Sequence, residues 1–295
     1  MLEFHELTIE EKSRADKALR ASDFRGCEYS FSNNLAWRRA ADSKIAFYKD
    51  FYICAATNPE FSCINPAGEG DRKEVITLLR KHAENLGQPL YLGGVTEEQF
   101  SFFEECFPGE YTVETNEDYY DYVYNTADFQ NFPGKKYHGK RNHLSRFKTM
   151  FNYECTDITE RDFDDCIVFA AQKFDDKEDS STEDTSSAVV EQFAIDTYFN
   201  EYYNLGLFGK IIRIDGKIAA FSVGDKLNSD TVDVHIEKAD TSFHGAYTAI
   251  ANLFSQGITE TYLNREEDLG IEGLRKSKQS YYPVFQIKKY RLTFK

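Results

Sequence analysis

Apolar and polar positions along the first half of the chain change between helical and strand periodicity. A capping box at Thr8 to Glu11 opens a helical pattern that runs to about Arg20. Two apolar runs on either side of Lys49-Asp50 predict a β-hairpin. The other predicted elements are strands at 61–65, 91–92, 111–115 and 119–125, and helices at 71–86 and 96–107. The first half therefore mixes α and β structure.

The second half continues in the same style. Asp215-Gly216 separates two apolar runs and is the signal of a type I′ turn, which predicts a second hairpin. An acidic segment rich in Ser and Thr, residues 175–187, predicts a mobile loop and a candidate lid. The remaining predicted elements are helices at 134–151, 159–174, 188–203 and 244–257, and strands at 153–158, 231–237, 261–263 and 290–294.

This order of elements is typical of N-acyltransferases of the GNAT type: a helix pair, antiparallel strands, then strand, turn, helix and strand. The two halves are similar in style and divide near residues 126–133, although no residue-level repeat joins them. We therefore predict an α+β (mixed α/β) fold of two tandem GNAT-like domains, residues 1–130 and 131–295. The second domain is expected to carry the site.

Composition indicates a folded protein. The 295 residues are 41% hydrophobic and 15% aromatic, whereas disordered chains are poor in aromatic residues. The start of the chain lacks the pattern of a signal peptide, and no run approaches the ~18 apolar residues of a transmembrane helix, so a cytoplasmic location is expected. Six cysteines occur without a CxxC pair or nearby histidines, which predicts reduced core thiols and no metal site.

Charge is distributed unevenly. The net charge of −15 argues against generic binding to nucleic acid or to an anionic membrane. Residues 134–153 nevertheless hold six Lys or Arg and no acid, and residues 273–295 hold seven and no acid. Such islands mark the landing place of an anionic ligand or, alternatively, a solvated helix face.

The first basic island has the pattern of an amphipathic helix. Its predicted buried stripe consists of Tyr137, Leu144, Phe147 and Phe151. Lys140 and Arg141 lie at the two edges of that stripe, where they either extend outward to solvent or point into a cleft toward a donor or substrate. The outer face carries Lys135, His138, Asn142 and Arg146, which suit solvent or a tRNA backbone.

The segment 264–283, NREEDLGIEGLRKSKQSYYP, concentrates opposite charges around a predicted helix that begins near Asp268. Glu266 and Asp268 could bind an ammonium group, and Arg275 and Lys278 a carboxylate or phosphate. The candidate binding set is completed by Asn264 and Arg265. The alternative is a capped helix with surface salt bridges of little energetic value.

Three segments together carry a family resemblance: FPGKKYHGKRNHLSRF at 132–147, HIEKADTSFHGAY at 235–247, and 264–283. With them the chain resembles a bacterial family whose members are similar to the C-terminal domain of phosphatidylglycerol lysyltransferase. The resemblance implies a tandem GNAT fold akin to the Fem-type aminoacyltransferases. In the lysyltransferase this domain moves lysine from charged tRNA to a lipid head group, which makes aminoacyl-tRNA a candidate donor and tRNA a candidate partner.

The loop after the strand at 231–237 weakens acyl-CoA as the donor. Acetyl-CoA users carry [QR]xxGx[GA] here, and its backbone N–H groups bind the pyrophosphate. Residues 238–246 keep only Gly245-Ala246 of this pattern, and Asp240 would repel a phosphate. An aminoacyl-tRNA donor does not need that cradle.

Candidate catalytic groups lie beside this loop. His235 and Glu237 alternate along one strand and are expected to share a face, so they are the candidate general bases. Lone strand histidines are also common as core residues. Tyr281 or Tyr282 is the candidate acid for the leaving group, by analogy with GNAT enzymes that use a late tyrosine.

These features predict an acyl or aminoacyl transferase that acts on an amine or hydroxyl of a small-molecule or peptide acceptor. One alternative is a non-catalytic module that binds a small molecule or nucleotide. Another is a CoA-dependent N-acetyltransferase with a divergent loop. Binding without a transfer product would identify the first alternative, and binding of CoA would identify the second.

Overall fold

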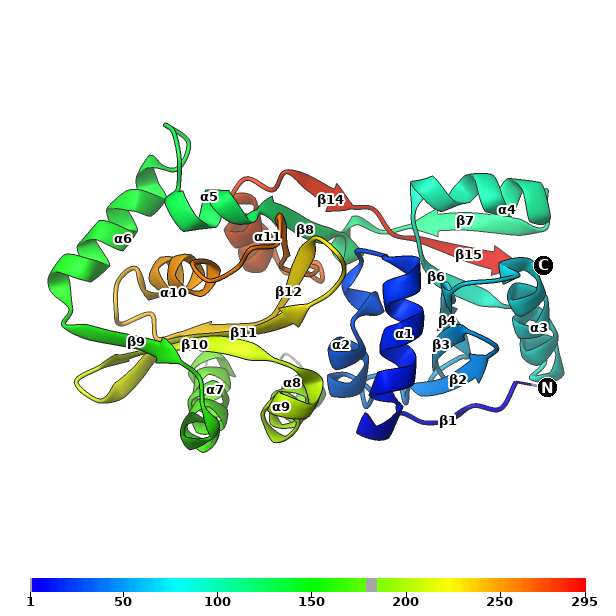
Figure 1. Ribbon diagram of the computed structural model, residues 1–295, viewed down its shortest axis with the longest axis horizontal. Helices are drawn as coiled ribbons and strands as arrows, with labels where there is room; N and C mark the ends of the chain where they lie inside the picture. The colour runs from blue at the N-terminus through cyan, green and yellow to red at the C-terminus, as the bar shows by residue number, and fades with distance from the viewer. Residues whose placement is uncertain (1, 179–184) are drawn as a thin grey trace.

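The chain folds into two mixed sheets placed end to end in an elongated molecule (Figure 1). This computed structural model describes residues 2–178 and 185–295, and the side chains of 173–178 and 185–187 lie outside the description. Each sheet has helices of its own and, among its described strands, one parallel pair. This architecture agrees with the predicted fold of two tandem GNAT-like units.

The first sheet has the order β1-β2-β3-β4-β6-β15-β7, with β5 paired to β3. Its strands are β1 (His5–Glu6), β2 (Lys44–Tyr48), β3 (Phe51–Ala56), β4 (Ser62–Ile64), β5 (Ala67–Gly68), β6 (Tyr91–Val95), β7 (Tyr111–Thr115) and β15 (Tyr290–Phe294). Its helices are α1 (Lys12–Ser22), α2 (Phe31–Ala36), α3 (Arg72–Asn85) and α4 (Phe100–Cys106). The parallel pair is β4 and β6, which α3 connects.

The second sheet has the order β14-β8-β13-β12-β11-β10-β9. Its strands are β8 (Asp121–Asn125), β9 (Tyr153–Asp157), β10 (Phe208–Ile214), β11 (Lys217–Lys226), β12 (Thr231–Ala239), β13 (Tyr262–Asn264) and β14 (Phe285–Ile287). Its helices are α5 (Thr126–Asn131), α6 (His138–Met150), α7 (Phe163–Glu178), α8 (Thr185–Asn200), α9 (Tyr202–Leu205), α10 (Ala246–Ser255) and α11 (Glu272–Gln279). The parallel pair is β12 and β13, which α10 connects.

The two units exchange strands. β8 precedes residue 130 yet pairs with β13 and β14 of the second sheet. β15 ends the chain yet pairs with β6 and β7 of the first sheet. The division between the sheets therefore does not follow a single cut of the chain.

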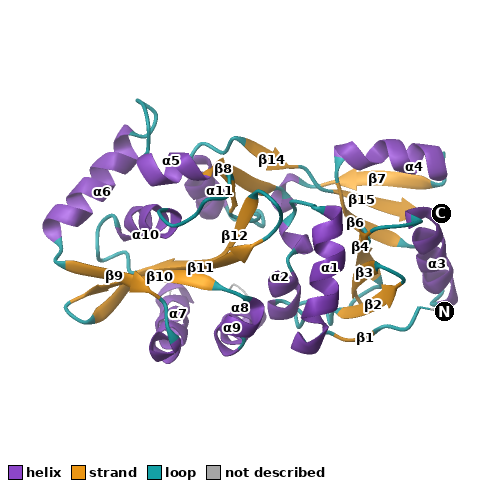
Figure 2. Cartoon of the chain, in the orientation of Figure 1, coloured by secondary structure: helices purple, strands orange, loops and turns teal. Residues whose placement is uncertain are grey.

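Helices cover both faces of the second sheet. α6 and α10 lie over one face, and α7, α8 and α9 lie over the other (Figure 2). One apolar cluster includes Leu19 and Phe31 from the first unit and Tyr198 and Phe221 from the second. The two units consequently share a hydrophobic core, and burial of that core holds them together.

Both predicted hairpins are confirmed. The backbone of Lys49 has a φ of 52° between β2 and β3, and Asp215 and Gly216 have φ values of 49° and 78° between β10 and β11. Only the second of these turns has positive φ at both central residues, as a type I′ turn requires. Of the stripe predicted for α6, Tyr137 and Phe147 are fully buried, while Leu144 and Phe151 are partly buried and pack against the core.

Two boundaries differ from expectation. The helix predicted from Asp268 begins only at Glu272, because Asp268 bonds to Gly270 and Arg275 instead of capping the first turn. Within the acidic segment 175–187, α7 continues to Glu178 and α8 begins at Thr185, while 179–184 lie outside the described residues. Across 2–178 and 185–295, no helix is both long and apolar enough to cross a membrane.

Candidate functional site

The second sheet opens at its parallel pair. β12 and β13 pair only where 231–233 face 262–264, and farther along β12 the two segments are no longer joined by backbone bonds. α10 starts after the loop that follows β12, with Gly245 at its N-cap and a φ of 90°. A Cβ at Gly245 would lie 2.7 Å from the carbonyl oxygen of His143, so glycine lets this loop approach α6.

A cavity of about 280 Å³ lies at this opening, between α6, the loop before α10, and α11. Lys140, His143 and His244 give it three basic side chains, and Asp240 is the one acid among its described lining residues. Tyr281 also lines it. The cavity therefore favours a ligand with negative charge or a polarised carbonyl group. We call it the α10 cavity.

Lys140 extends into the α10 cavity from α6. Its Nζ donates to Ser280 Oγ at 2.7 Å and lies 3.4 Å from the centre of the Tyr281 ring. The pKa of Lys140 is lowered to about 8, mainly by burial and also by the nearby Arg265, while Glu237 opposes both effects. A substantial fraction of this amine is thus neutral in mildly alkaline solution, when it can accept a proton.

Tyr281 lies beneath Lys140 and is 3% exposed. Its ring stacks on Phe129 with centroids 4.9 Å apart. Burial raises the pKa of Tyr281 to about 12, with a smaller increase from Glu237. The phenol therefore keeps its proton at neutral pH and can donate it.

A buried ion pair supports these two residues. Arg265 Nη2 lies 2.6 Å from Glu237 Oε1, and both side chains are about one-tenth exposed. Arg265 is also 5.0 Å from the Tyr281 ring centre. Burial raises the pKa of Glu237, whereas Arg265, Lys140 and Lys278 lower it. The pair bridges β12 and the segment after β13 where the backbones have parted.

The loop before α10 is closed on itself. Ser242 N–H donates to Asp240 Oδ1 at 2.9 Å, so the carboxylate occupies a backbone donor that could otherwise face a phosphate. At the rim of the cavity, His143 Nδ1 and His244 Nε2 are 3.1 Å apart. Burial lowers the pKa of His143, with further lowering from His244 and Lys140.

His235 does not share a face with Glu237, contrary to the expected alternation. The register of β11 and β12 shifts between Val223 and Gly224, where Val223 pairs with Ile236 and Gly224 with Val234. This bulge leaves His235 stacked on Tyr198 of α8, away from the α10 cavity. Its side chain is 0% exposed and both ring nitrogens contact carboxylates.

The acids and cations of segment 264–283 are held by partners within the protein, some inside the segment and others outside it. Arg275 bonds both oxygens of Asp268 at 2.8 Å, and Tyr122 donates to Asp268 Oδ2 at 2.6 Å. Lys278 is buried and donates to the backbone carbonyls of Arg265 and Glu267. The predicted opposite charges are therefore present, but their contacts fasten the segment to itself and to neighbouring elements.

Three other predicted residues also have internal partners. Arg141 donates to the carbonyl oxygens of Phe132 and Gly134 before α6. Asn264 donates to Arg25 O at 3.0 Å and to Asp121 Oδ2 at 2.9 Å. Glu266 accepts from Asn33 Nδ2 at 2.8 Å. The described cavity lining thus includes Lys140 and Tyr281 of the predicted set, with Glu237 and Arg265 directly supporting them.

A larger cavity of about 520 Å³ lies between α1 and the β11–β12 connection. Its lining includes Lys12, Arg20, Asp225 and Asn228. Sequence analysis missed this cavity, and it also missed Thr248 in the lining of the α10 cavity and Ser280 as the partner of Lys140. Hydroxyl residues are frequent in loops and helices, so neither carried a usable signal.

Comparison with known proteins shows the family to which the chain is similar. Residues 19–293 match the family model described as phosphatidylglycerol lysyltransferase, C-terminal. A conserved protein of unknown function from Bacteroides thetaiotaomicron VPI-5482 is 34% identical, with 100% of each chain covered and a TM-score of 0.94. A comparison with curated protein sequences gave no match.

Two more distant structures share the fold. L-PGS from Bacillus licheniformis is 14% identical, with 96% of this chain and 91% of that chain covered and a TM-score of 0.66. FemX is 8% identical, with 98% and 96% covered and a TM-score of 0.61. Because the family match spans nearly the whole sequence, the chain belongs to the phosphatidylglycerol lysyltransferase C-terminal family.

Proposed function

We propose that the chain is a GNAT-like acyltransferase that moves an acyl or aminoacyl group to an amine or hydroxyl in the α10 cavity. The observation that carries this proposal is the placement of Lys140. Its amine has a pKa of about 8 and contacts Ser280 and the Tyr281 ring at the opening between β12 and β13. A proton acceptor and a proton donor therefore line one cavity.

The proposed step needs no further group. The acceptor nitrogen or oxygen attacks the donor carbonyl carbon, and Lys140 Nζ takes the proton that the nucleophile loses. The bond between that carbon and the donor oxygen then breaks, and Tyr281 supplies the proton for the departing oxygen. Lys140 returns a proton to Tyr281 through solvent, so the protein ends the cycle unchanged. Glu237 and Arg265 act as positioning residues that set the charge around Lys140.

Aminoacyl-tRNA is the proposed donor. The contact between Ser242 N–H and Asp240 Oδ1 supports it, because the carboxylate both fills a backbone donor and repels a pyrophosphate. The family description, which names a lysyltransferase, also favours an aminoacyl donor. The proposed contact for the tRNA backbone is the exposed face of α6, with Arg146, together with Lys135 in the turn before that helix.

Calorimetry with two small donors tests this choice. The first is 3′-aminoacylamino-adenosine, a stable amide copy of the charged tRNA terminus, and the second is acetyl-CoA. We expect saturable binding of the adenosine compound and its weakening by at least tenfold in Lys140→Met. His138→Ala, on the exposed face of α6, is the matched control.

Stoichiometric binding of acetyl-CoA alone would replace the proposed donor with CoA. Binding of the adenosine compound without any transfer product from charged tRNA would favour the non-catalytic module. Both results would overturn the proposal in its present form.

A further inference from the structure

A second polar cluster surrounds His235 at the junction of the two units. Asp233 and His235 are two residues apart on β12, and Glu266 follows β13. The imidazole and the two carboxylates each offer a ligand atom, and these atoms lie within 4.8 Å of one another. This set, the His235 cluster, has no part in the acyl-transfer step proposed above.

Asp233 is the unusual member of the His235 cluster. Its side chain is 0% exposed, and neither carboxylate oxygen has a hydrogen-bond partner among the described residues. Among the side chains that the structure describes, in 2–172 and 188–295, the His235 imidazole is the basic group within 4.0 Å of Asp225, Asp233 and Glu266, and no lysine or arginine nitrogen lies that close. A buried carboxylate without a hydrogen-bond partner is strongly unfavourable, and the single imidazole can offset only one of the three carboxylate charges. The cluster therefore has the charge to bind a further cation.

The distances fit a metal ion. His235 Nδ1 lies 3.2 Å from Glu266 Oε1 and 3.7 Å from Asp233 Oδ2. Ligand atoms of a tetrahedral zinc site are about 3.4 Å apart, because each lies roughly 2.1 Å from the ion. The second oxygen of Asp233 or Glu266 can supply a fourth ligand.

The outer contacts have the arrangement that metal sites use. His235 Nε2 lies 3.1 Å from Asp225 Oδ1, and Ser32 Oγ donates to Asp225 Oδ2. A carboxylate on the far nitrogen fixes the ring so that Nδ1 presents its lone pair to the ion. Glu266 is held by Asn33 Nδ2. Ser32 and Asn33 belong to α2, so these contacts join the two units.

We propose that Asp233, His235 and Glu266 bind a divalent transition-metal ion of the zinc type, which ties the first unit to the second. Imidazole nitrogen and carboxylate oxygen together suit such an ion. Because the ligands are buried, the ion has a structural role and binds as the chain folds.

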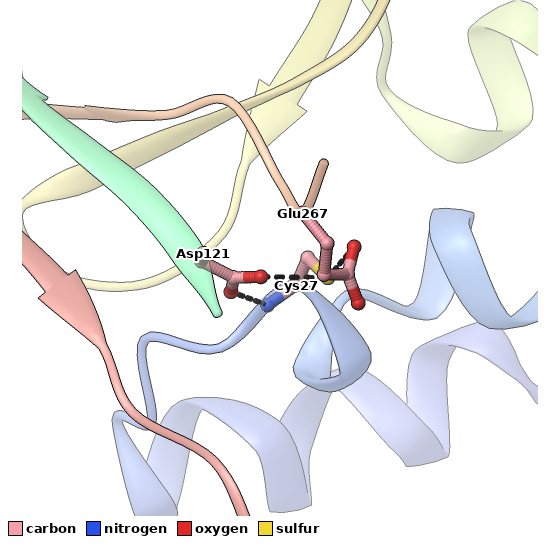
Figure 3. A group of neighbouring side chains, drawn as sticks. All are labelled: Cys27, Asp121 and Glu267. Carbon is pink, nitrogen blue, oxygen red and sulfur yellow. Dashed lines mark hydrogen bonds between the residues drawn. The ribbon is translucent and has the colours of Figure 1, made fainter. Parts of the chain in front are cut away.

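A neighbouring cluster of possible metal ligands differs from the His235 cluster because it already contains a lysine. Cys27, Asp121 and Glu267 also point toward one another (Figure 3). There, however, Lys289 Nζ lies 2.6 Å from Asp121 Oδ1 and 3.2 Å from Glu267 Oε1. The lysine ammonium already serves as the cation of that cluster.

Metal analysis of the full-length protein tests the proposal. After growth with added Zn²⁺ and gel filtration, we expect about one zinc per chain, falling at least tenfold in Asp233→Asn. Cys27→Ser is the matched control, because it removes a candidate ligand from the cluster that Lys289 fills, and its zinc content should equal that of the wild type. Stripping the metal should lower the Tm, and Zn²⁺ should restore it.

If Asp233→Asn does not fold, the visible spectrum of wild-type protein loaded with Co²⁺ tests the metal site instead. Visible d–d bands with the intensity of a four-coordinate site are expected. The rival is a cluster neutralised by protons alone, with a charged imidazolium between carboxylates. Less than one-tenth of an equivalent of metal in the wild type, absent d–d bands, or full zinc content in folded Asp233→Asn would each overturn the metal site.

Discussion

Lys140 Nζ lies 3.4 Å from the centre of the Tyr281 ring, and the same ring is 5.0 Å from the Arg265 guanidinium. Two cations thus share one aromatic residue at the floor of the α10 cavity. Because like charges repel, loss of a proton from the stronger acid of the two is favoured, and that acid is the Lys140 ammonium. Arg265, in contrast, forms an ion pair with Glu237 that favours its charged form.

The first prediction concerns the reactivity of Lys140. With a pKa of about 8, roughly a tenth of its amine is neutral at pH 7 and roughly nine-tenths at pH 9. Competitive labelling with acetic anhydride, read by mass spectrometry, should give a midpoint near pH 8. The labelling of exposed Lys135 is followed in the same sample as a reference. Equal midpoints for the two lysines would remove the basis for Lys140 as proton acceptor.

Arg265 and Glu237 should shift that midpoint in opposite directions. Arg265→Met removes a neighbouring positive charge, so the pKa of Lys140 should rise toward its ordinary value of 10.5. Glu237→Gln removes the negative charge that favours the ammonium, so the pKa should fall below 8. The labelling midpoints of the two folded variants test this. Shifts of the same sign would contradict the electrostatic account.

The Glu237–Arg265 pair should also show strong coupling in stability. Glu237→Leu alone leaves Arg265 buried without its partner and should lower the free energy of unfolding by about 3–5 kcal/mol. The double variant Glu237→Leu/Arg265→Met should lose clearly less than the sum of the single losses. Urea unfolding of all four proteins measures this, and simple additivity would show that the pair is not coupled.

Tyr281→Phe separates proton donation from packing. The ring remains, so stability should change by only about 1 kcal/mol, the value of a typical hydrogen bond. The chemical step should slow by about 10² to 10⁴, the usual contribution of a general acid. Single-turnover transfer rates measure it, with Tyr282→Phe as the exposed neighbouring control. A normal rate would restrict Tyr281 to packing.

The lowered pKa of Asp268 predicts that the protein loses stability at acidic pH. Contacts with Arg275, Tyr122 and the Gly270 N–H lower its pKa to about 2, against the opposing effect of burial, from an ordinary value of 3.8. A lowered folded-state pKa contributes stability above pH 3.8 that is lost as pH falls toward 2. The difference in unfolding free energy between wild type and Asp268→Asn should therefore be constant near pH 6 and shrink below pH 4. A difference that does not change with pH would contradict this.

Local patterns predicted much of the fold, because hairpin turns and buried helix stripes depend on residues close in sequence. The Asp215-Gly216 turn and the Tyr137–Phe147 stripe are examples. The exchange of β8 and β15 between sheets was not predictable, since pairing across more than 130 residues leaves no periodic signal.

The site was predicted only in part, for the same reason. The edge position of Lys140 on its helix was visible, but its contact with Ser280 joins residues 140 positions apart. Strand alternation predicts that His235 and Glu237 share a face, but the bulge at His235 places the two side chains on different faces. One extra residue in a strand changes the face of the residues after it. The charges of 264–283 were recognised, whereas their mutual pairing depends on the three-dimensional path of the loop.

Transfer itself is the most direct test of the central claim. Wild type and Lys140→Arg would be incubated with a pool of tRNA charged with labelled amino acids and, separately, with labelled acetyl-CoA. Lysine amide and phosphatidylglycerol vesicles serve as the amine and hydroxyl acceptors. We predict label transfer from charged tRNA by the wild type, reduced at least a hundredfold in Lys140→Arg, whose side chain stays charged and cannot accept the proton. Equal transfer by the two proteins, or transfer from acetyl-CoA alone, would contradict the account.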